Sequence, residues 1–228
     1  MANICETELV IVGRKPAVQK IYETAKSIPT TPHSHGIFLG DLIEKLDPTK
    51  NENNNWGGIV CSGWINEYFK EVENPYHTEF EDPDNHDNDI VSIHMDYDSK
   101  WQACTDVHEF LETMFEHQDL CCYYRESEPG EGIFYTNSKE YFPEQYYMDT
   151  ECDTSQYKDI FAVAKALIGF GYIDKFKNFD KETDYAAMAA DKREKIELKL
   201  IKEVRKFIET YNKGNDDDWI TLEEYELC

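Results

Sequence analysis

The fold is decided by residues 90–137, which read IVSIHMDYDSKWQACTDVHEFLETMFEHQDLCCYYRESEPGEGIFYTN. The first eight residues alternate between apolar and polar side chains, and this alternation predicts a strand over residues 90–97. Apolar side chains then recur at helical spacing, which predicts a helix over residues 105–117. The turn sequence EPGEG separates two further predicted strands, residues 119–126 and 132–137.

The residues before this stretch add a strand and a helix. Residues 4–12, ICETELVIV, alternate like a strand, and Pro16 marks the start of a helix over residues 16–26. Residues 28–89 are irregular and are interpreted as an insertion, in which the apolar runs 37–46 and 59–69 are predicted to be helical. The order of elements predicts an α+β fold with one mostly antiparallel sheet and helices on one face.

The composition changes after Thr154. An apolar helix is predicted over residues 159–176, and a long amphipathic helix over residues 185–211. The apolar stripe of the second helix is expected to pack against the first helix or against a second protomer, which would make a homodimer. The sequence therefore predicts two domains, residues 1–154 and a helical extension over residues 155–228.

The charge of the chain is strongly negative and unevenly distributed. Asp and Glu number 47 against 23 Lys and Arg, for a net charge of −24, and residues 50–153 alone carry −20 of it. An acidic excess of this size disfavours direct binding to nucleic acid or to an anionic membrane. It either keeps the protein soluble or selects a partner with a basic surface. Averaged over the surface, the charge is several-fold more dilute than on duplex DNA, which carries roughly one charge per 100 Å², so any DNA mimicry must be local.

Membrane-spanning and exported proteins are not expected. No apolar run approaches the ~18 residues of a membrane span, and the N-terminus lacks the basic region of a signal peptide. The seven cysteines are an odd number without a CxxC motif, which is typical of reduced thiols. The expected location is the cytoplasm, that of the host cell if a phage encodes the protein.

Two short regions carry a resemblance to a known family. The opening MANICETELVIVG and the stretch DYDSKW through EPGEG are similar to the ferredoxin-like domain of YubB-like and phage Api-type proteins, over roughly residues 1–27 and 88–150. The matching positions are Asn3, Cys5, Lys100, Trp101, Asp119, Leu120, Tyr123, Glu128, Pro129, Gly130 and Gly132. The resemblance implies a ferredoxin-like sheet and an origin in plasmids or phages. It implies no enzymatic activity and supplies no catalytic residues.

Candidate metal-binding motifs are incomplete. His33 and His35 form an H-x-H pair without a visible third ligand. The acidic residues at 82–89, and the segment NKGNDDDWITLEEYE near the C-terminus, both lack the glycine that a calcium loop requires at its sixth position. No nucleophile, phosphate loop or cofactor motif is present, and we therefore predict no cofactor.

These observations predict an acidic interaction protein that is not an enzyme. It would bind the basic surface of a host nuclease or nucleic-acid-binding complex and inhibit it, in the manner of a DNA mimic or an anti-CRISPR protein. The predicted contact residues are Glu79, Glu81, Asp82, Asp84, Asp87, Asp89, Glu126, Glu128 and Glu131. Two alternatives remain: a metal-dependent enzyme that uses clustered carboxylates, and a structural or regulatory domain without such a partner.

Overall fold

Strand β1 (Ile4–Arg14) lies inside the sheet that organises the N-terminal part of the computed structural model. The chain divides into two compact units: unit 1 comprises Met1–Phe142 with Leu227–Cys228, and unit 2 comprises Pro143–Glu226. The residues that the structure describes are 4–29, 36–72, 90–151, 154–172, 190–215 and 219–228.

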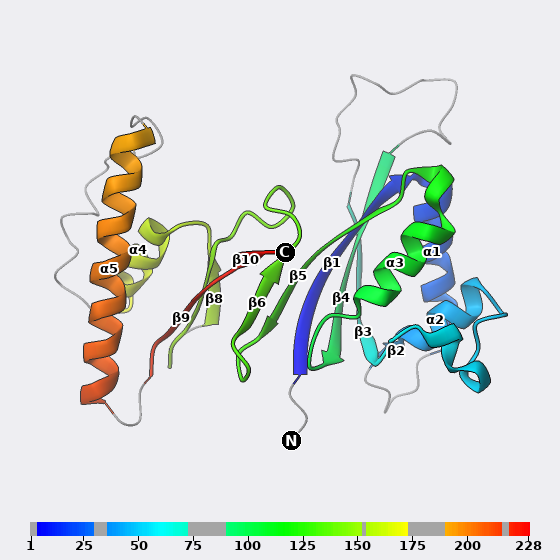
Figure 1. The fold of residues 1–228 in the computed structure, drawn as a ribbon, viewed down its shortest axis with the longest axis horizontal. Coiled ribbons are helices and arrows are strands. Elements are labelled where there is room, and N and C mark those ends of the chain that lie inside the picture. The colour runs from blue at the N-terminus through cyan, green and yellow to red at the C-terminus, as the bar shows by residue number, and fades with distance from the viewer. Residues whose placement is uncertain (1–3, 30–35, 73–89, 152–153, 173–189, 216–218) are drawn as a thin grey trace. The chain divides into compact units, whose positions relative to one another are not determined.

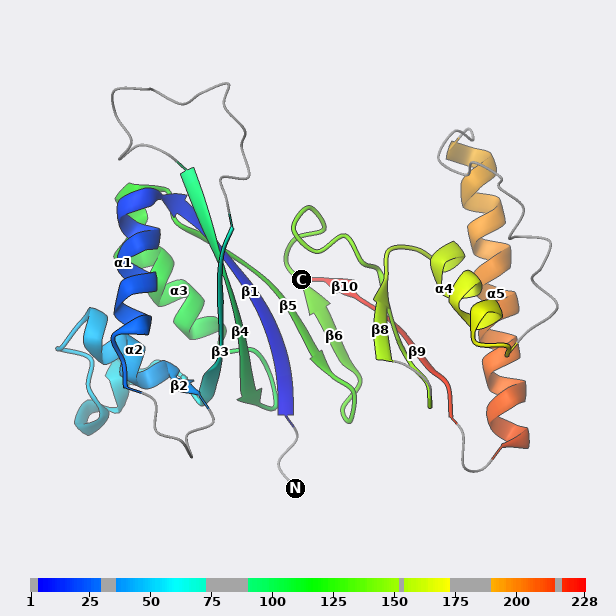
Figure 2. The same cartoon turned by 180° about the vertical axis from the view of Figure 1, so that it is seen from behind.

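Unit 1 is an α+β unit built on a seven-stranded sheet with the strand order β10-β6-β5-β1-β4-β3-β2. Figure 1 and, from behind, Figure 2 show helices α1, α2 and α3 together on one side of these strands. In chain order its elements are β1, α1 (Lys15–Lys26), β2 (Ile37–Phe38), α2 (Leu39–Leu46), the 3-10 helix η1 (Glu52–Gly58), β3 (Gly63–Val72), β4 (Ile90–Lys100), α3 (Thr105–Met114), the 3-10 helix η3 (Glu116–Gln118), β5 (Cys121–Glu128), β6 (Ile133–Thr136) and β10 (Glu226–Leu227).

The second half of β1 is buried on both faces, which explains its position in the sheet. Leu9 and Ile11 face the main core, whereas Val10 and Val12 pack with Phe142 in a small cluster on the opposite face. A strand that is covered on both sides needs a continuous apolar run, and the sequence LVIV supplies it.

Helices α1 and α3 pack on the same face of the sheet, as the sequence predicts. Ala17 and Ile21 of α1, and Val107 and Leu111 of α3, belong to the same buried cluster as Leu9 of β1. The four predicted strands, now β1, β4, β5 and β6, pair antiparallel within one sheet. This part of the prediction is confirmed.

The segment interpreted as an insertion is in part an integral piece of unit 1. The run 59–69, predicted to be helical, instead enters strand β3, which pairs antiparallel with β4. Gly63 and Ile65 are buried while Trp64 and Asn66 are partly exposed, and this period of two is the mark of a strand. Leu42, Ile43 and Ile65 join the main core, so these described residues complete the sheet and its helical layer.

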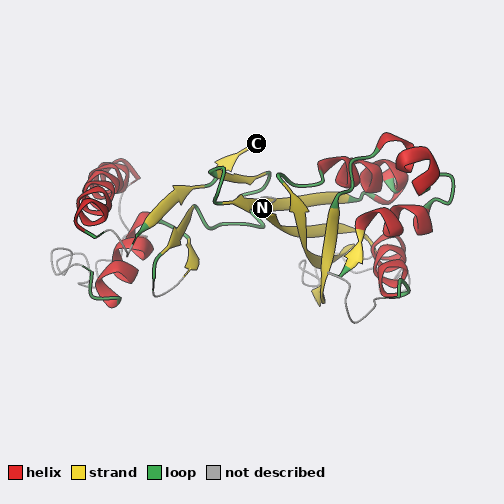
Figure 3. Cartoon of the chain, turned by 90° about the horizontal axis from the view of Figure 1, so that it is seen from below, coloured by secondary structure: helices red, strands yellow, loops and turns green. Residues whose placement is uncertain are grey.

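Unit 2 is also α+β, whereas the sequence predicted only helices. Its three-stranded sheet has the order β8-β7-β9, and both pairings are antiparallel. Figure 3 shows its strands and helices in separate layers. Its elements are β7 (Tyr146–Asp149), β8 (Thr154–Tyr157), α4 (Ile160–Gly169), α5 (Ala190–Gly214) and β9 (Thr221–Glu224). The boundary between the units falls at Phe142–Pro143, before the expected position near residue 154, because β7 and β8 pack with α4 and α5.

Helix α5 buries its apolar stripe against α4 and the small sheet. Leu200 and Val204 are fully buried in one cluster with Val163 and Leu167 of α4. The expected packing of the two C-terminal helices is therefore present within one chain. Across the described residues, every helix is too short or too polar to traverse a bilayer.

We predict that Leu200→Ala destabilises the protein strongly. Removing a fully buried leucine leaves a cavity and should lower the free energy of unfolding by about 2–5 kcal/mol. Leu198 is 53% exposed on the same helix, so Leu198→Ala is the matched control and should change stability by less than about 0.5 kcal/mol. Urea denaturation of the two full-length variants measures the difference, and equal losses would contradict the packing of α5.

Candidate functional site: the acidic face of the sheet

The two faces of the unit 1 sheet differ in chemistry. Along β1 and β4, the residues that face the helices include Leu9, Ile11, Ile93 and Met95, all of them in the main core. The opposite face, which we call the open face, carries the alternate residues of each strand. Charged side chains are concentrated there, at the end of the sheet where β1 begins.

Four carboxylates lie on the open face in two directly opposed pairs. In the antiparallel register of β1 and β4, Glu6 is opposite Asp98 and Glu8 is opposite Asp96. We call this set of four the carboxylate ladder. Side chains in such cross-strand pairs have Cβ atoms about 4.5–5.5 Å apart, and like charges at that distance repel.

The electrostatics of the ladder reflect this crowding. The pKa of Glu6 is raised by partial burial and by the negative charges of Asp98 and Glu8. The amide of Asn66 on β3 donates a hydrogen bond of 3.4 Å to Asp98 Oδ1. The cluster of like charges therefore raises the free energy of the ionised Glu6 carboxylate.

Arg125 on β5 borders the ladder and is held rigidly. Its guanidinium lies 2.7 Å from Glu8 Oε1 and is stacked over the ring of Phe142 at 5.0 Å. The Arg125 side chain is only 4% exposed, so its positive charge stabilises the Glu8 carboxylate and is little available to solvent. The ladder with Arg125 retains an excess of negative charge.

Two exposed apolar side chains lie at the same end of the sheet. Ile4 is opposite Lys100 in the β1–β4 register, and Trp101 follows directly. Ile4 is 53% exposed and Trp101 54% exposed. Trp101 has φ of 77°, a left-handed backbone conformation that is rare for a bulky residue. An exposed tryptophan in a strained backbone is a feature that concentrates at binding sites.

The structure separates the acidic residues that the sequence singled out. Glu131 is exposed, but Glu126 and Glu128 are buried, at 7% and 3% exposure. The side chain of Glu128 accepts a hydrogen bond from the backbone N–H of Glu131. Glu126 and Glu128 therefore do not belong to an exposed acidic surface. The other predicted contacts, Glu79, Glu81, Asp82, Asp84, Asp87 and Asp89, lie outside the described residues.

Glu126 belongs to a buried polar group beneath the start of α3. Its Oε2 accepts a hydrogen bond of 2.5 Å from the backbone N–H of Ala103 and one of 3.5 Å from the Cys5 thiol. Burial, together with the charge of Glu126, raises the pKa of Cys5 to about 12. A thiol in this environment is protonated and unreactive at neutral pH.

Tyr97 and His108 form a second buried pair. The Tyr97 hydroxyl lies 3.0 Å from His108 Nε2 and accepts a hydrogen bond from the backbone N–H of Cys104. His108 Nδ1 is buried without a hydrogen-bond partner. Burial lowers the pKa of His108 to about 4, so the ring is neutral at physiological pH.

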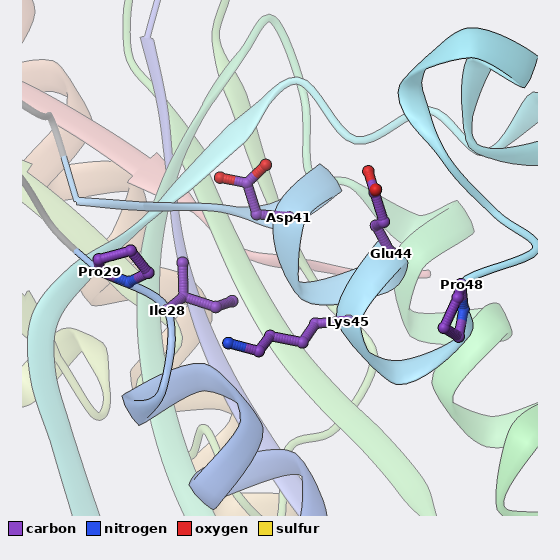
Figure 4. Close-up of a pocket in the computed structure, with 6 residues that line it drawn as sticks. All are labelled: Ile28, Pro29, Asp41, Glu44, Lys45 and Pro48. Atoms are coloured by element: carbon purple, nitrogen blue, oxygen red, sulfur yellow. The ribbon is translucent and has the colours of Figure 1, made fainter.

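A shallow pocket lies between the end of α1 and helix α2. Its volume is about 520 Å³, and its lining is Ile28, Pro29, Asp41, Glu44, Lys45 and Pro48. Figure 4 shows that the carboxylates of Asp41 and Glu44 point away from the Lys45 ammonium. Lys45 donates a hydrogen bond to the carbonyl of Ser27. The charged groups thus do not converge on one point.

Metal ligands do not gather in the part of the chain that the structure describes, where no group of three His, Cys, Asp or Glu side chains is placed to hold an ion. The H-x-H pair His33 and His35 lies outside that part.

Comparison with known proteins finds no match to a protein-family model, to a curated protein or to a solved structure.

Sequence reasoning missed the carboxylate ladder, although part of the signal was present. In ICETELV, Glu6 and Glu8 alternate with Cys5 and Thr7, which places both carboxylates on one face of a strand. Asp96 and Asp98 alternate in the same way. The opposition of these two pairs depends on the β1–β4 register, which the alternation alone does not determine.

We predict that Glu126→Ala destabilises the protein, whereas Glu131→Ala does not. The first substitution leaves the buried N–H of Ala103 without an acceptor and should lower the free energy of unfolding by about 1–3 kcal/mol. Glu131 is exposed, so its truncation should cost less than about 0.5 kcal/mol. Chemical denaturation at neutral pH measures both. A neutral Glu126→Ala substitution would show that this carboxylate has no structural role.

We also predict that His108 makes the protein less stable in mild acid. Because its pKa is about 4 when folded and about 6.5 when unfolded, only the unfolded chain binds the proton between these values. Stability should therefore fall as the pH drops from 6.5 to 4, by up to about 3 kcal/mol from this residue. Unfolding measured from pH 7 to pH 4 should depend less on pH in His108→Gln, while the exposed-residue control His117→Gln should follow the parent. An unchanged slope in His108→Gln would contradict the burial of a neutral ring.

Proposed function

We propose that the chain is an acidic interaction protein with a ferredoxin-like unit, and that the open face of that unit binds a basic surface of a nucleic-acid-binding protein. The carboxylate ladder is the observation that carries this proposal. The proposed role is that of a host-defence inhibitor of the DNA-mimic type, encoded by a phage or another mobile element.

The topology of unit 1 supports the ferredoxin-like part of the proposal. The elements β1, α1, β3, β4, α3 and β5 follow one another in the order strand, helix, strand, strand, helix, strand. Within the sheet, the four strands have the order β5-β1-β4-β3, with antiparallel neighbours. This order is the one expected for the split βαβ pattern of ferredoxin-like domains, with β2, α2 and β6 as additions, and it supports the proposal.

The local charge density supports the electrostatic part. On one face of a sheet, each residue occupies roughly 33 Å², given strands about 4.8 Å apart and a repeat of about 6.8 Å. Four opposed carboxylates, together with Arg125 and Lys100 beside them on the same face, occupy six such positions with a net charge of −2, which is roughly one net charge per 100 Å². Duplex DNA carries roughly one charge per 100 Å². The ladder reaches the density that the chain as a whole lacks.

The ladder is also costly for the isolated protein. Directly opposed like charges destabilise a sheet, and the pKa of Glu6 is raised by burial and by its acidic neighbours. A cationic surface that approaches Glu6 in a complex would offset this cost. Trp101 and Ile4 at the same end supply apolar contact area, and tryptophan is among the residues that contribute most to protein interfaces.

We predict that neutralising the ladder weakens partner binding without harming the fold. The test variant combines Glu6→Gln, Asp96→Asn and Asp98→Asn, and the matched control combines Glu52→Gln, Glu109→Gln and Glu116→Gln at exposed positions away from the ladder. Both variants lose three negative charges, so a general effect of net charge would change partner binding equally in the two. The melting temperature of the test variant should stay the same or rise.

The measurement has two steps. The full-length protein, used as bait in host lysate, should retain a DNA-binding partner at ~0.15 M salt and release it at ~0.5 M. The purified partner should then lose binding to a DNA duplex when the parent or the control is added, and keep it when the ladder variant is added. If the ladder variant blocks DNA binding as well as the parent does, the open face is not the binding surface. A third variant, with the six acids of residues 79–89 neutralised, tests the remaining predicted contacts in the same assay.

A further inference from the structure

Helix α5 carries a row of lysines on the side that faces away from its core. The row consists of Lys192, Lys195, Lys199, Lys202 and Lys206, all of them exposed. We call it the lysine stripe. The spacing of three and four residues places all five on one side of an α-helix, over about 21 Å of its length.

The stripe is separate from the packing of unit 2. At 100° per residue, its centre lies roughly opposite the buried residues Leu200, Val204 and Ile208. Of the five lysines, Lys199 alone has an ion pair within the described part of the chain, at 3.8 Å to Glu203. The arginines of the helix point elsewhere: Arg193 pairs with Glu197 and Asp159, and Arg205 pairs with Glu224. Within the described residues, the only ion pair that unit 2 makes with the stripe is therefore the one at Lys199.

This concentration of positive charge is unusual for the chain. Acidic residues outnumber basic ones 47 to 23 overall, yet residues 192–206 hold seven Lys and Arg against three Glu. A one-sign row on an exposed helix is suited to an anionic surface of similar spacing. Lysines three and four residues apart have Cβ atoms about 5–6 Å apart, and the Cβ atoms of the ladder residues are about 5 Å apart across the strands and about 7 Å apart along them.

We propose that the lysine stripe of one molecule docks on the carboxylate ladder of a second copy of this chain. The two surfaces have opposite charge and comparable spacing, and every molecule carries both. The contact is heterologous, head to tail, so it generates a ring or an open series of oligomers rather than a symmetric dimer. Both copies carry −24, but at physiological salt the repulsion beyond about 8 Å is screened while the direct contacts persist.

A nucleic-acid backbone is the competing occupant of the stripe. Phosphates would meet the same lysines, but they would leave the opposed carboxylates of the ladder without a cationic partner, whereas a second copy satisfies both surfaces. We therefore treat phosphate binding as an outcome of the test that would overturn the proposal.

The experiment neutralises each surface in turn and follows self-association by sedimentation velocity. The stripe variant is Lys195→Gln, Lys199→Gln and Lys202→Gln, and the ladder variant is Glu6→Gln, Asp96→Asn and Asp98→Asn. The parent at ~0.1 M salt should self-associate with rising concentration and dissociate at ~0.5 M salt. Each variant alone should associate at least about tenfold more weakly. An equimolar mixture of the two should form a 1:1 heterodimer and nothing larger, because only one intact stripe and one intact ladder remain.

Several results would overturn the proposal: a parent that is monomeric at every concentration, variants that associate like the parent, or a mixture that does not form the heterodimer. Binding of a 20-base-pair DNA duplex by the monomeric parent, lost in the stripe variant, would assign the stripe to phosphate instead. Circular dichroism and thermal melting check that each variant is folded, and a ladder variant that fails is replaced by the milder Glu6→Gln and Asp98→Asn.

The proposal shares the carboxylate ladder with the proposed function, but the two fail separately. The stripe variant keeps the ladder intact, so it should still bind the DNA-binding partner while it no longer self-associates. Loss of self-association alone leaves the proposed function standing, and loss of partner binding alone leaves the docking of two copies standing.

Discussion

The pairing of β1 with β4 is the constraint on which unit 1 depends. It runs antiparallel over eleven residues without a break, from Ile4 opposite Lys100 to Arg14 opposite Ile90. The same register that brings Leu9 and Ile11 to the helices brings the four carboxylates of the ladder together on the open face. A shift by one residue would exchange the two faces, so burial of the core fixes the position of the acidic site.

The core thus supplies the energy that holds like charges together. Burying apolar side chains on the helix side of the sheet contributes on the order of 1.5–3 kcal/mol each, whereas cross-strand repulsion costs a fraction of a kcal/mol to about 1 kcal/mol per pair. The sheet can therefore carry opposed carboxylates without unfolding. The repulsion between the carboxylates lies on the open face, where a cationic partner would reduce it. Arg125 already reduces it at Glu8.

The two units use charge in opposite ways. Unit 1 presents carboxylates from adjacent strands, and unit 2 presents lysines from one helix whose apolar side is already occupied by its own core. Paired strands of a sheet arrange charged side chains in a grid, and a helix arranges them in a row. In both arrangements neighbouring residues are about 5–7 Å apart. The net charge of the chain conceals this difference, because it adds both surfaces together.

The sequence by itself determined the elements whose hydrophobic period is long and regular: β1, α1, β4, α3, β5, β6 and the buried stripe of α5. It also determined the acidic character of the chain. Only the tertiary structure decided which strands are neighbours, and hence that Glu6 meets Asp98 while Glu126 turns inward to Ala103. Alternation assigns a residue to a face of a strand but does not say which face is covered, or which strand lies beside it. The strand β3 was mistaken for a helix for the related reason that a short apolar run fits either period.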